Sequence, residues 1–265
     1  MKTTLTIAGS DCSGGAGIQA DIKAISANGV FAMSVITAIT SQNTMGVFDV
    51  QNVTPDMIKS QINAIFDDIN VDSIKIGMVS KIESIRAIGE ALTSISKLPP
   101  IVLDPVMVSK SGYKLLSNDA KETLIKELFP LATLVTPNLP EAEEILNIKI
   151  ENLDDMRKAA IKILKLGCKS VLIKGGHLEG DSTDLFFDGN KFSYYKQERI
   201  NVKHTHGTGC TLSSAIAANI AKGMELEEAI EEGKEYITKA IQYGFKLGNG
   251  VGPTNHFYKF YGLEK

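Results

Sequence analysis

The chain has 265 residues and a nearly balanced charge, with 28 Lys and Arg against 31 Asp and Glu and a net charge of −3. Hydrophobic residues make up 43% and charged residues 22%, which is typical of a globular protein with a sizeable apolar core. This balance gives no basic surface for nucleic acid, and the longest apolar runs, such as residues 35–39, are too short to cross a bilayer. We therefore expect neither nucleic acid nor a membrane among the partners.

The three cysteines of the chain, Cys12, Cys168 and Cys210, are widely spaced and form no CxxC pattern. An odd number of cysteines without a pairing pattern indicates free thiols and a cytoplasmic location. The first ten residues contain one lysine and no long apolar stretch, so we expect no secretory signal. His204 and His206 lie near Cys210 but match no common zinc-binding spacing.

Short β-branched runs alternate along the chain with longer amphipathic segments. Strands are predicted at residues 3–8, 31–40, 73–76, 101–103, 134–136 and 171–174. Helices are predicted at residues 17–28, 55–69, 81–96, 118–128, 153–165, 208–222 and 226–247. Residues 184–188 and 191–195 flank a Gly-Asn pair and are predicted to form a hairpin. The alternation predicts an α/β fold in a single domain over residues 1–265, with a mostly parallel sheet and helices on both faces.

The segment from His204 to Ala218 is the most informative part of the chain. It predicts a glycine loop that leads directly into a helix, so that the N–H groups of Gly207, Thr208 and Gly209 can surround an anion at the helix N-terminus. Cys210, in the first helical turn, is a candidate base whose thiolate the same N–H groups would stabilise. Phosphoryl transfer needs this combination. The alternative is an ordinary glycine-rich loop with a buried structural cysteine.

The first glycine-rich loop, residues 9–21, follows a strand and fits G-x-G-x-x-A from Gly15 to Ala20. A dinucleotide fingerprint would also need an acidic residue at the end of the next strand, and residues 37–43 contain none. We therefore expect a loop that lets the backbone approach a small ligand. Asp21, one turn into the helix, either reaches into that pocket or is a solvated helix residue. The chain also contains no Walker A pattern, which excludes a P-loop kinase.

Two further positions carry candidate phosphate and metal chemistry at strand ends. Asp104 can hold Mg²⁺ through water, or it is a turn or cap aspartate. Residues 110–114 contain lysines and form either a mobile flap or a polar loop. Lys174 ends a buried strand, where a lysine needs an anionic partner. That partner is either a nucleotide phosphate or Asp184.

Asn138 and Glu141 lie three residues apart at the predicted start of a helix. This spacing is typical of a capping box. It also suits an amide and a carboxylate that hold metal-bound water at the phosphates. The spacing does not separate the two interpretations, and both can hold together.

In chain order the motifs are GSDCSGGAGIQAD, QNT, KIGM, DPVM, TPNLPEA, IKGGH and THGTGCT. This set resembles the ribokinase-like superfamily and, within it, the bacterial hydroxymethylpyrimidine/phosphomethylpyrimidine kinases of thiamine biosynthesis. The resemblance runs from Leu5 to about His256. It implies a ribokinase-like α/β fold, ATP with Mg²⁺, and usually a homodimer; it leaves open a monovalent cation as a further cofactor.

The resemblance also implies roles for particular residues. ATP is expected near Asn138, Lys174, Gly207 and Thr208, with Asp104 and Glu141 at the metal. The pyrimidine is expected beside a second group of residues: Gly9, Asp21, Gln42, Met78 and Val106. Catalysis is assigned to the anion loop Gly207, Thr208, Gly209 and Cys210, with Cys210 as the base if the helix end lowers its pKa, or as a group that orients the hydroxyl.

The expected reaction is ATP-dependent phosphorylation of 4-amino-5-hydroxymethyl-2-methylpyrimidine and then of its monophosphate. The alternative within the superfamily is a pyridoxal kinase. That branch tends to have Met-Asp where this chain has Gln42 and Asn43, and a second cysteine where this chain has Ser109. Gln42 offers both a donor and an acceptor, which suits an aminopyrimidine. A ligand-binding protein without catalysis is a third interpretation, which the intact set of motifs disfavours.

Overall fold

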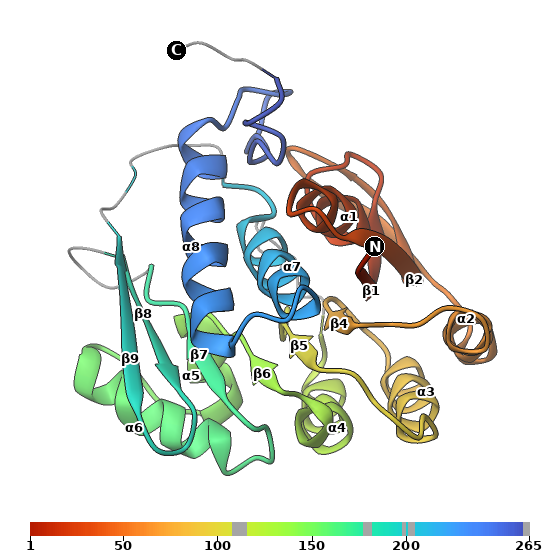
Figure 1. Cartoon of the computed structure of the whole chain (residues 1–265), viewed down its shortest axis with the longest axis horizontal. Helices are drawn as coiled ribbons and strands as arrows, with labels where there is room; N and C mark the ends of the chain where they lie inside the picture. The colour runs from red at the N-terminus through yellow and green to blue at the C-terminus, as the bar shows by residue number, and fades with distance from the viewer. Residues whose placement is uncertain (108–115, 177–181, 198–199, 201–204, 262–265) are drawn as a thin grey trace.

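The computed structural model describes residues 1–107, 116–176, 182–197, 200 and 205–261. Nine strands form one sheet in the order β3-β2-β1-β4-β5-β6-β7-β8-β9 (Figure 1). The parallel strands are β1 (Thr3–Asp11), β2 (Phe31–Asn43), β4 (Ser73–Ile76), β5 (Ile101–Leu103), β6 (Leu134–Val135) and β7 (Val171–Ile173). The antiparallel strands are β3 (Gly46–Asn52), β8 (Ser182–Phe187) and β9 (Phe192–Gln197). The predicted mostly parallel sheet and the predicted hairpin, β8–β9, are confirmed.

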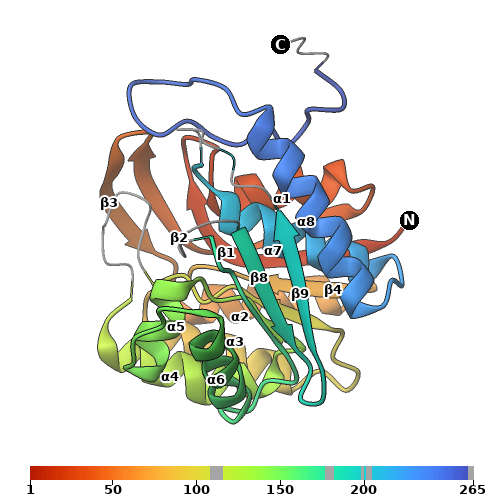
Figure 2. The ribbon, with the colours of Figure 1, turned by 90° about the vertical axis from the view of Figure 1, so that its left-hand side faces the viewer.

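Helices cover both faces of the sheet, as predicted (Figures 1 and 2). One face carries α2 (Pro55–Phe66), α3 (Ile82–Thr93), α4 (Asn118–Leu128), α5 (Leu139–Leu146) and α6 (Leu153–Leu164). The other face carries α1 (Gly17–Ala27), α7 (Thr208–Ala221) and α8 (Leu226–Gln242). A short 3₁₀ helix, η1 (Phe129–Leu131), follows α4.

The side chains of β5 show how the two cores arise from one strand. Ile101 and Leu103 pack in the larger core with α2 to α6, whereas Val102 packs in the smaller core with α7 and α8. Successive side chains of a strand point to opposite faces, so a strand buried on both faces is apolar throughout. This explains the continuous apolar runs in the sequence.

Two elements differ from the sequence-based prediction, and a third, the helix predicted to begin after Asn138, is given its full extent. Residues 46–52 form β3, which was not predicted because its residues alternate weakly and lie at the sheet edge. Residues 139–146 form the short helix α5, which ends at Asn147 in the left-handed conformation (φ 52°). The last helix was predicted to reach residue 247 but ends at Gln242, two residues before Gly244.

The strand order places the loops that carry the motifs at one edge of the sheet. The chain proceeds from β1 to β2 and β3 on one side, and from β4 through β7 on the other, so the order reverses between β1 and β4. Parallel α/β sheets bind ligands at the carboxyl ends of the strands at such a reversal. None of the helices within the described residues is long and apolar enough to span a membrane.

Candidate active site

The predicted glycine loop does lead into a helix, α7, whose N-cap is Gly207. Gly207 has a φ of 78°, and a Cβ at this position would lie 1.9 Å from the carbonyl oxygen of Gly15, so only glycine fits. An N-cap without a side chain leaves the first N–H groups of the helix free to receive an anion. The hydroxyl of Thr208 donates to the carbonyl of Thr205 (3.1 Å), which turns it back onto its own loop.

An ion pair between Lys174 and Asp104 lies against this loop. Lys174 Nζ is 2.9 Å from Asp104 Oδ1, and Asp104 is buried. A Cβ on Gly209 would lie 3.3 Å from Lys174 Nζ and 3.4 Å from Asp104 Oδ2. The interpretation of Asp104 as an isolated turn or cap residue is therefore wrong. The structure brings together a cation, a carboxylate and an anion-binding loop.

The alternative partner predicted for Lys174 is also wrong. Asp184 is paired with Lys234 of α8, and it accepts a hydrogen bond from the backbone N–H of Gly175 (2.9 Å). Both side chains of this second pair are buried. The side chain of Lys174, of which 15% is exposed, is thus left with one described carboxylate partner and access to a ligand.

Asn138 and Glu141 form the capping box that their spacing predicts. The Asn138 side chain accepts from the N–H of Glu141, and the Glu141 carboxylate accepts from the N–H of Asn138, each over 2.8 Å. Burial raises the pKa of Glu141 to about 7; Lys174 opposes this rise and Asp104 adds to it. The capping role is therefore established, while the buried carboxylate remains close enough to Asp104 and Lys174 to interact with both.

The donors present fit Mg²⁺ that is bound mainly by phosphate and water. Two buried carboxylates, Asp104 and Glu141, both interact with Lys174, and the Lys174 ammonium group is hydrogen-bonded to Asp104. The described residues contain no group of three or more His, Cys, Asp or Glu that could hold a metal alone. Mg²⁺ commonly binds through one or two carboxylates and substrate phosphates, which is the set available here.

Cys210 lies in the first turn of α7 and is partly exposed. Burial raises the pKa of its thiol to about 11, and this effect outweighs the lowering by Lys75 and by a hydrogen bond with the backbone of Gly17. The expectation that the helix end lowers this pKa is therefore wrong for the protein without substrates. The thiol, and not the thiolate, is the resting form of Cys210 at neutral pH.

Asp21 is not the solvated helix residue that was one of its two interpretations. It is fully buried, and Lys75 Nζ donates to both of its carboxylate oxygens over 2.8 Å. Thr6 (2.7 Å) and Ser214 (2.8 Å) donate to the same carboxylate. A solvated position is wrong, and these four contacts leave little of the carboxylate for a substrate. Sequence reasoning missed Lys75, although a lysine inside the buried run of residues 73–76 was a signal that a buried anion must exist.

Apart from Asp21, the residues expected at the pyrimidine lie on or just after four neighbouring strands, β2, β1, β4 and β5. A Cβ on Gly9 would be 3.4 Å from the sulfur of Met78, so these two residues adjoin as expected. The amide Nε2 of Gln42 is 3.2 Å from Nε2 of His206, in the segment before α7. Val106 follows β5 and its N–H donates to the carbonyl of Asp104 (2.8 Å).

Asp11 and His206, which sequence reasoning did not assign to the site, connect the first glycine loop to the anion loop. Nε2 of His206 is 3.0 Å from Oδ2 of Asp11. Burial alone would raise the pKa of Asp11, but hydrogen bonds with His206 and Ser13 lower it to about 2. A Cβ on Gly15 would lie 2.4 Å from the His206 ring. The two glycine loops are therefore packed against each other and held by a buried pair.

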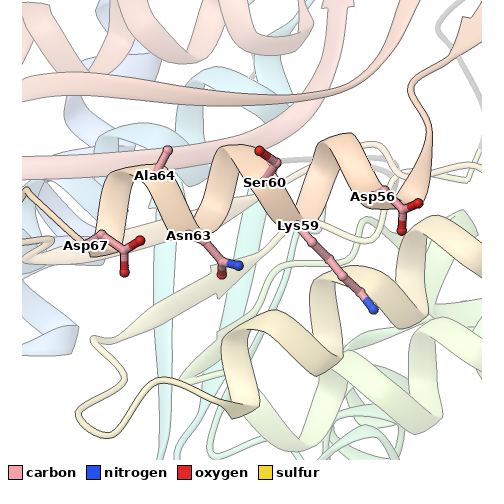
Figure 3. A pocket seen from close by; sticks show the side chains of 6 residues that line it. All are labelled: Asp56, Lys59, Ser60, Asn63, Ala64 and Asp67. Carbon is pink, nitrogen blue, oxygen red and sulfur yellow. The ribbon is translucent and has the colours of Figure 1, made fainter.

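Several predicted features lie outside the described residues, namely Ser109, the lysines of residues 110–114, His177 and His204. A surface hollow elsewhere is lined by Asp56, Lys59, Ser60, Asn63, Ala64 and Asp67, all on α2 (Figure 3). It contains none of the residues named above. The chemistry gathers instead at the carboxyl ends of β1, β4, β5 and β7.

An anion loop at a helix N-terminus, a Lys174–Asp104 pair beneath it and an α/β sheet that reverses its order define a kinase for a small molecule. The phosphomethylpyrimidine kinase family model matches residues 11–255. The chain belongs to this family.

Curated relatives cover nearly the whole chain. It is 49% identical over 261 residues to the hydroxymethylpyrimidine/phosphomethylpyrimidine kinase of Rhizobium meliloti, covering 97% of each chain. It is also 49% identical over 255 residues to the thiamine biosynthesis bifunctional protein ThiED of Geobacter sulfurreducens, covering 96% of this chain and 52% of that protein.

Solved structures agree with this membership, and they are ribokinase-like kinases. The phosphomethylpyrimidine kinase of Clostridium difficile is 54% identical, with a TM-score of 0.81, and covers 91% of this chain and 100% of its own. The pyridoxal kinase of Staphylococcus aureus in complex with AMP-PCP and pyridoxal is 36% identical, with a TM-score of 0.88, and covers 98% and 96%.

Proposed function

We propose that the protein transfers the γ-phosphoryl group of ATP to the hydroxymethyl group of 4-amino-5-hydroxymethyl-2-methylpyrimidine, and then a second phosphoryl group to the monophosphate, in thiamine biosynthesis. The observation that carries the proposal is the position of the anion loop over the Lys174–Asp104 pair, with Cys210 in the same helical turn. The family and the relatives named above support the choice of substrate.

The residues at this edge of the sheet have two roles: they bind the nucleotide, and they neutralise the negative charge of its phosphates. Lys174, whose side chain is 15% exposed and whose Nζ lies beside Gly209, contacts the phosphates of ATP. The N–H groups of Gly209 and Cys210 receive the negative charge that develops on the transferred phosphoryl group. Asp104 and Glu141 would hold Mg²⁺, directly or through water; when bound, the ion neutralises phosphate charge. A monovalent cation would add to the same neutralisation.

Cys210 is the proposed base. The thiol first loses its proton to solvent, because the resting form is protonated. As the substrate hydroxyl oxygen bonds to the γ-phosphorus, its O–H bond breaks and the proton passes to Sγ of Cys210. The bond between the γ-phosphorus and the bridging oxygen breaks, and its electron pair leaves with ADP. In a loose transition state this proton transfer contributes less than the anion loop.

The substrate pocket is proposed to lie beside β1, β2 and β4. Gly9 and Met78 would contact the ring, and the Gln42 amide would pair with ring nitrogen and exocyclic amine, with Val106 on the opposite side. Asp21 acts through Lys75 and Ser214, because its carboxylate is buried behind them.

A pyridoxal kinase is the second candidate function, favoured by the S. aureus structure with pyridoxal. The two functions separate in one assay: ADP release is followed with the hydroxymethylpyrimidine, its monophosphate and pyridoxal, each at several concentrations with saturating ATP and Mg²⁺. We expect the highest kcat/KM for the pyrimidines. A higher kcat/KM for pyridoxal would replace the proposed function by the second one.

We also propose that the chain is a single domain, works in the cytoplasm and forms a homodimer. One sheet joins all nine strands, and the three cysteines are free thiols. Large apolar side chains at the β2–β3 edge, namely Ile39, Met45 and Phe48, are more than half exposed and would suit a contact with a second copy. Light scattering tests the dimer: a mass of 28.6 kDa at micromolar concentration would refute it.

A further inference from the structure

The buried ion pair of Asp21 and Lys75 lies one helical turn behind Cys210. The backbone of Gly17, the first residue of α1, hydrogen-bonds to Cys210, near the start of α7. Four residues later in each helix, Asp21 accepts a hydrogen bond from Ser214 (2.8 Å). The two helices are neighbours (Figure 1), and these two contacts, four residues apart in each helix, show that they run in the same direction. One turn is about 5 Å, so the ion pair lies about one helical turn from Cys210 along α7.

Lys75 is fixed in this position more tightly than an ordinary lysine. Its side chain is fully buried on β4, and Nζ is held by both oxygens of Asp21. A Cβ on Gly77 would lie 2.6 Å from Nζ, so glycine is needed to make room for the ammonium group. The described contacts of Nζ use two of its three N–H bonds, and the third is not taken up by Asp21.

Four charged groups act on the thiol of Cys210, and they differ in whether a bound nucleotide would change their charge environment. Asp104 and Lys174 form an ion pair beside the anion loop, where a bound nucleotide would contact them. Asp21 and Lys75 form the buried pair, which no ligand can reach. Of the buried pair, Lys75 has the stronger effect on Cys210 and acts in the direction that favours the thiolate. Its charge stays in place when anionic phosphates enter the site.

We propose that the buried ammonium group of Lys75, held by Asp21, is the positioning charge that stabilises the thiolate of Cys210 while this residue accepts the proton of the substrate hydroxyl. The proposal rests on the base role given to Cys210 above. Lys75 does not touch substrate or nucleotide. It acts only through the sulfur, and Asp21 acts only through Lys75.

The test is the alkylation of Cys210 by iodoacetamide without substrates, followed at the Cys210 peptide by mass spectrometry between pH 7 and 10. The thiolate is the reactive form, and a rise of one pKa unit slows alkylation about tenfold at a pH well below the pKa. We expect Lys75→Met to slow the reaction at pH 8 by about this factor. In wild type, kcat should increase with pH as the thiol of Cys210 loses its proton. In the same variant this increase should occur at higher pH.

Lys75→Met leaves a buried aspartate unpaired and can unfold the protein, so a second variant is needed. Asp21→Asn with Lys75→Met removes both charges and keeps the shapes, and it should slow alkylation in the same direction by a smaller factor. The matched control is Asp184→Asn with Lys234→Met, which makes the same change in the other buried pair. The control should leave the alkylation rate of Cys210 within twofold of wild type.

Alkylation within twofold of wild type in the folded double variant Asp21→Asn/Lys75→Met would overturn the proposal. Slowed alkylation with an unshifted kcat profile would also overturn it, because the thiol would then take no part in the transfer. The alkylation readout requires no pyrimidine or ATP. A protein inactive on pyrimidines but with the expected alkylation rates would contradict the proposed substrate, and would leave the electrostatic effect of Lys75 on Cys210 in place.

Discussion

Lys174 is the residue whose replacement should weaken ATP use most directly. In Lys174→Ala the charge-assisted contact to phosphate is lost, a contact worth roughly 1.5–3 kcal/mol for a charged group. Since 1.4 kcal/mol corresponds to a factor of ten, kcat/KM for ATP should fall about 10- to 150-fold. The loss has a second source in the structure. Asp104 loses the ammonium group that now pairs with it, and the pKa of Glu141 should rise further, because Lys174 is the charge that opposes its rise.

The assay measures initial rates of ADP release over a range of ATP concentrations at saturating pyrimidine. The matched control is Lys234→Met, which removes the buried lysine paired with Asp184 of β8 and should lower the melting temperature with a much smaller effect on ATP KM. If Lys174→Ala has the wild-type KM for ATP and only a lowered melting temperature, Lys174 is a structural partner of Asp104 and the assignment to phosphate is wrong.

The remaining predictions concern the base, specificity, the metal and acid stability. Cys210→Ala should fold and bind ATP but lose about 10²- to 10⁴-fold in kcat, whereas a few-fold loss in the same steady-state assay would leave catalysis to the anion loop. Gln42→Met leaves polar groups of the pyrimidine ring without a hydrogen-bond partner, so the ratio of kcat/KM for hydroxymethylpyrimidine to kcat/KM for pyridoxal should fall about tenfold for each 1.4 kcal/mol lost. Equal losses for both substrates would make Gln42 a supporting residue. Because the pKa of Glu141 is raised to about 7, Mg²⁺-dependent kcat/KM for ATP should rise more steeply near pH 7 than deprotonation of Cys210 alone provides, and Glu141→Gln should leave only the part of the rise that belongs to Cys210. The pKa of Asp11 is lowered to about 2 in the folded protein from a usual value of 3.8. This difference stabilises the folded state by about 2 kcal/mol above pH 4, and the stabilisation is lost as the pH falls from about 4 to 2. Denaturation of Asp11→Asn against wild type should therefore show a stability difference at pH 7 that shrinks below pH 4, and a constant difference would contradict the account.

The sequence by itself determined the elements that are long, periodic or bounded by strong signals. The parallel strands were readable because a strand buried on both faces is apolar throughout, as residues 101–103 are. The capping box of Asn138 and Glu141 and the glycine loop before α7 were readable because their hydrogen bonds are local. The edge strand β3 was not, since its stability comes from pairing with β2 and not from its own pattern.

Only the tertiary structure decided which charges meet. The spacing of Lys174 and Asp184 along the chain suggested a pair, yet Lys174 meets Asp104 across the sheet and Asp184 meets Lys234 of α8. The pKa of Cys210 followed the same rule. Its place at a helix N-terminus, visible in the sequence, favoured a lowered pKa, but burial in the folded protein raises the pKa of the thiol to about 11. Burial and ion pairing depend on contacts between residues distant in sequence, and for that reason no local pattern encodes them.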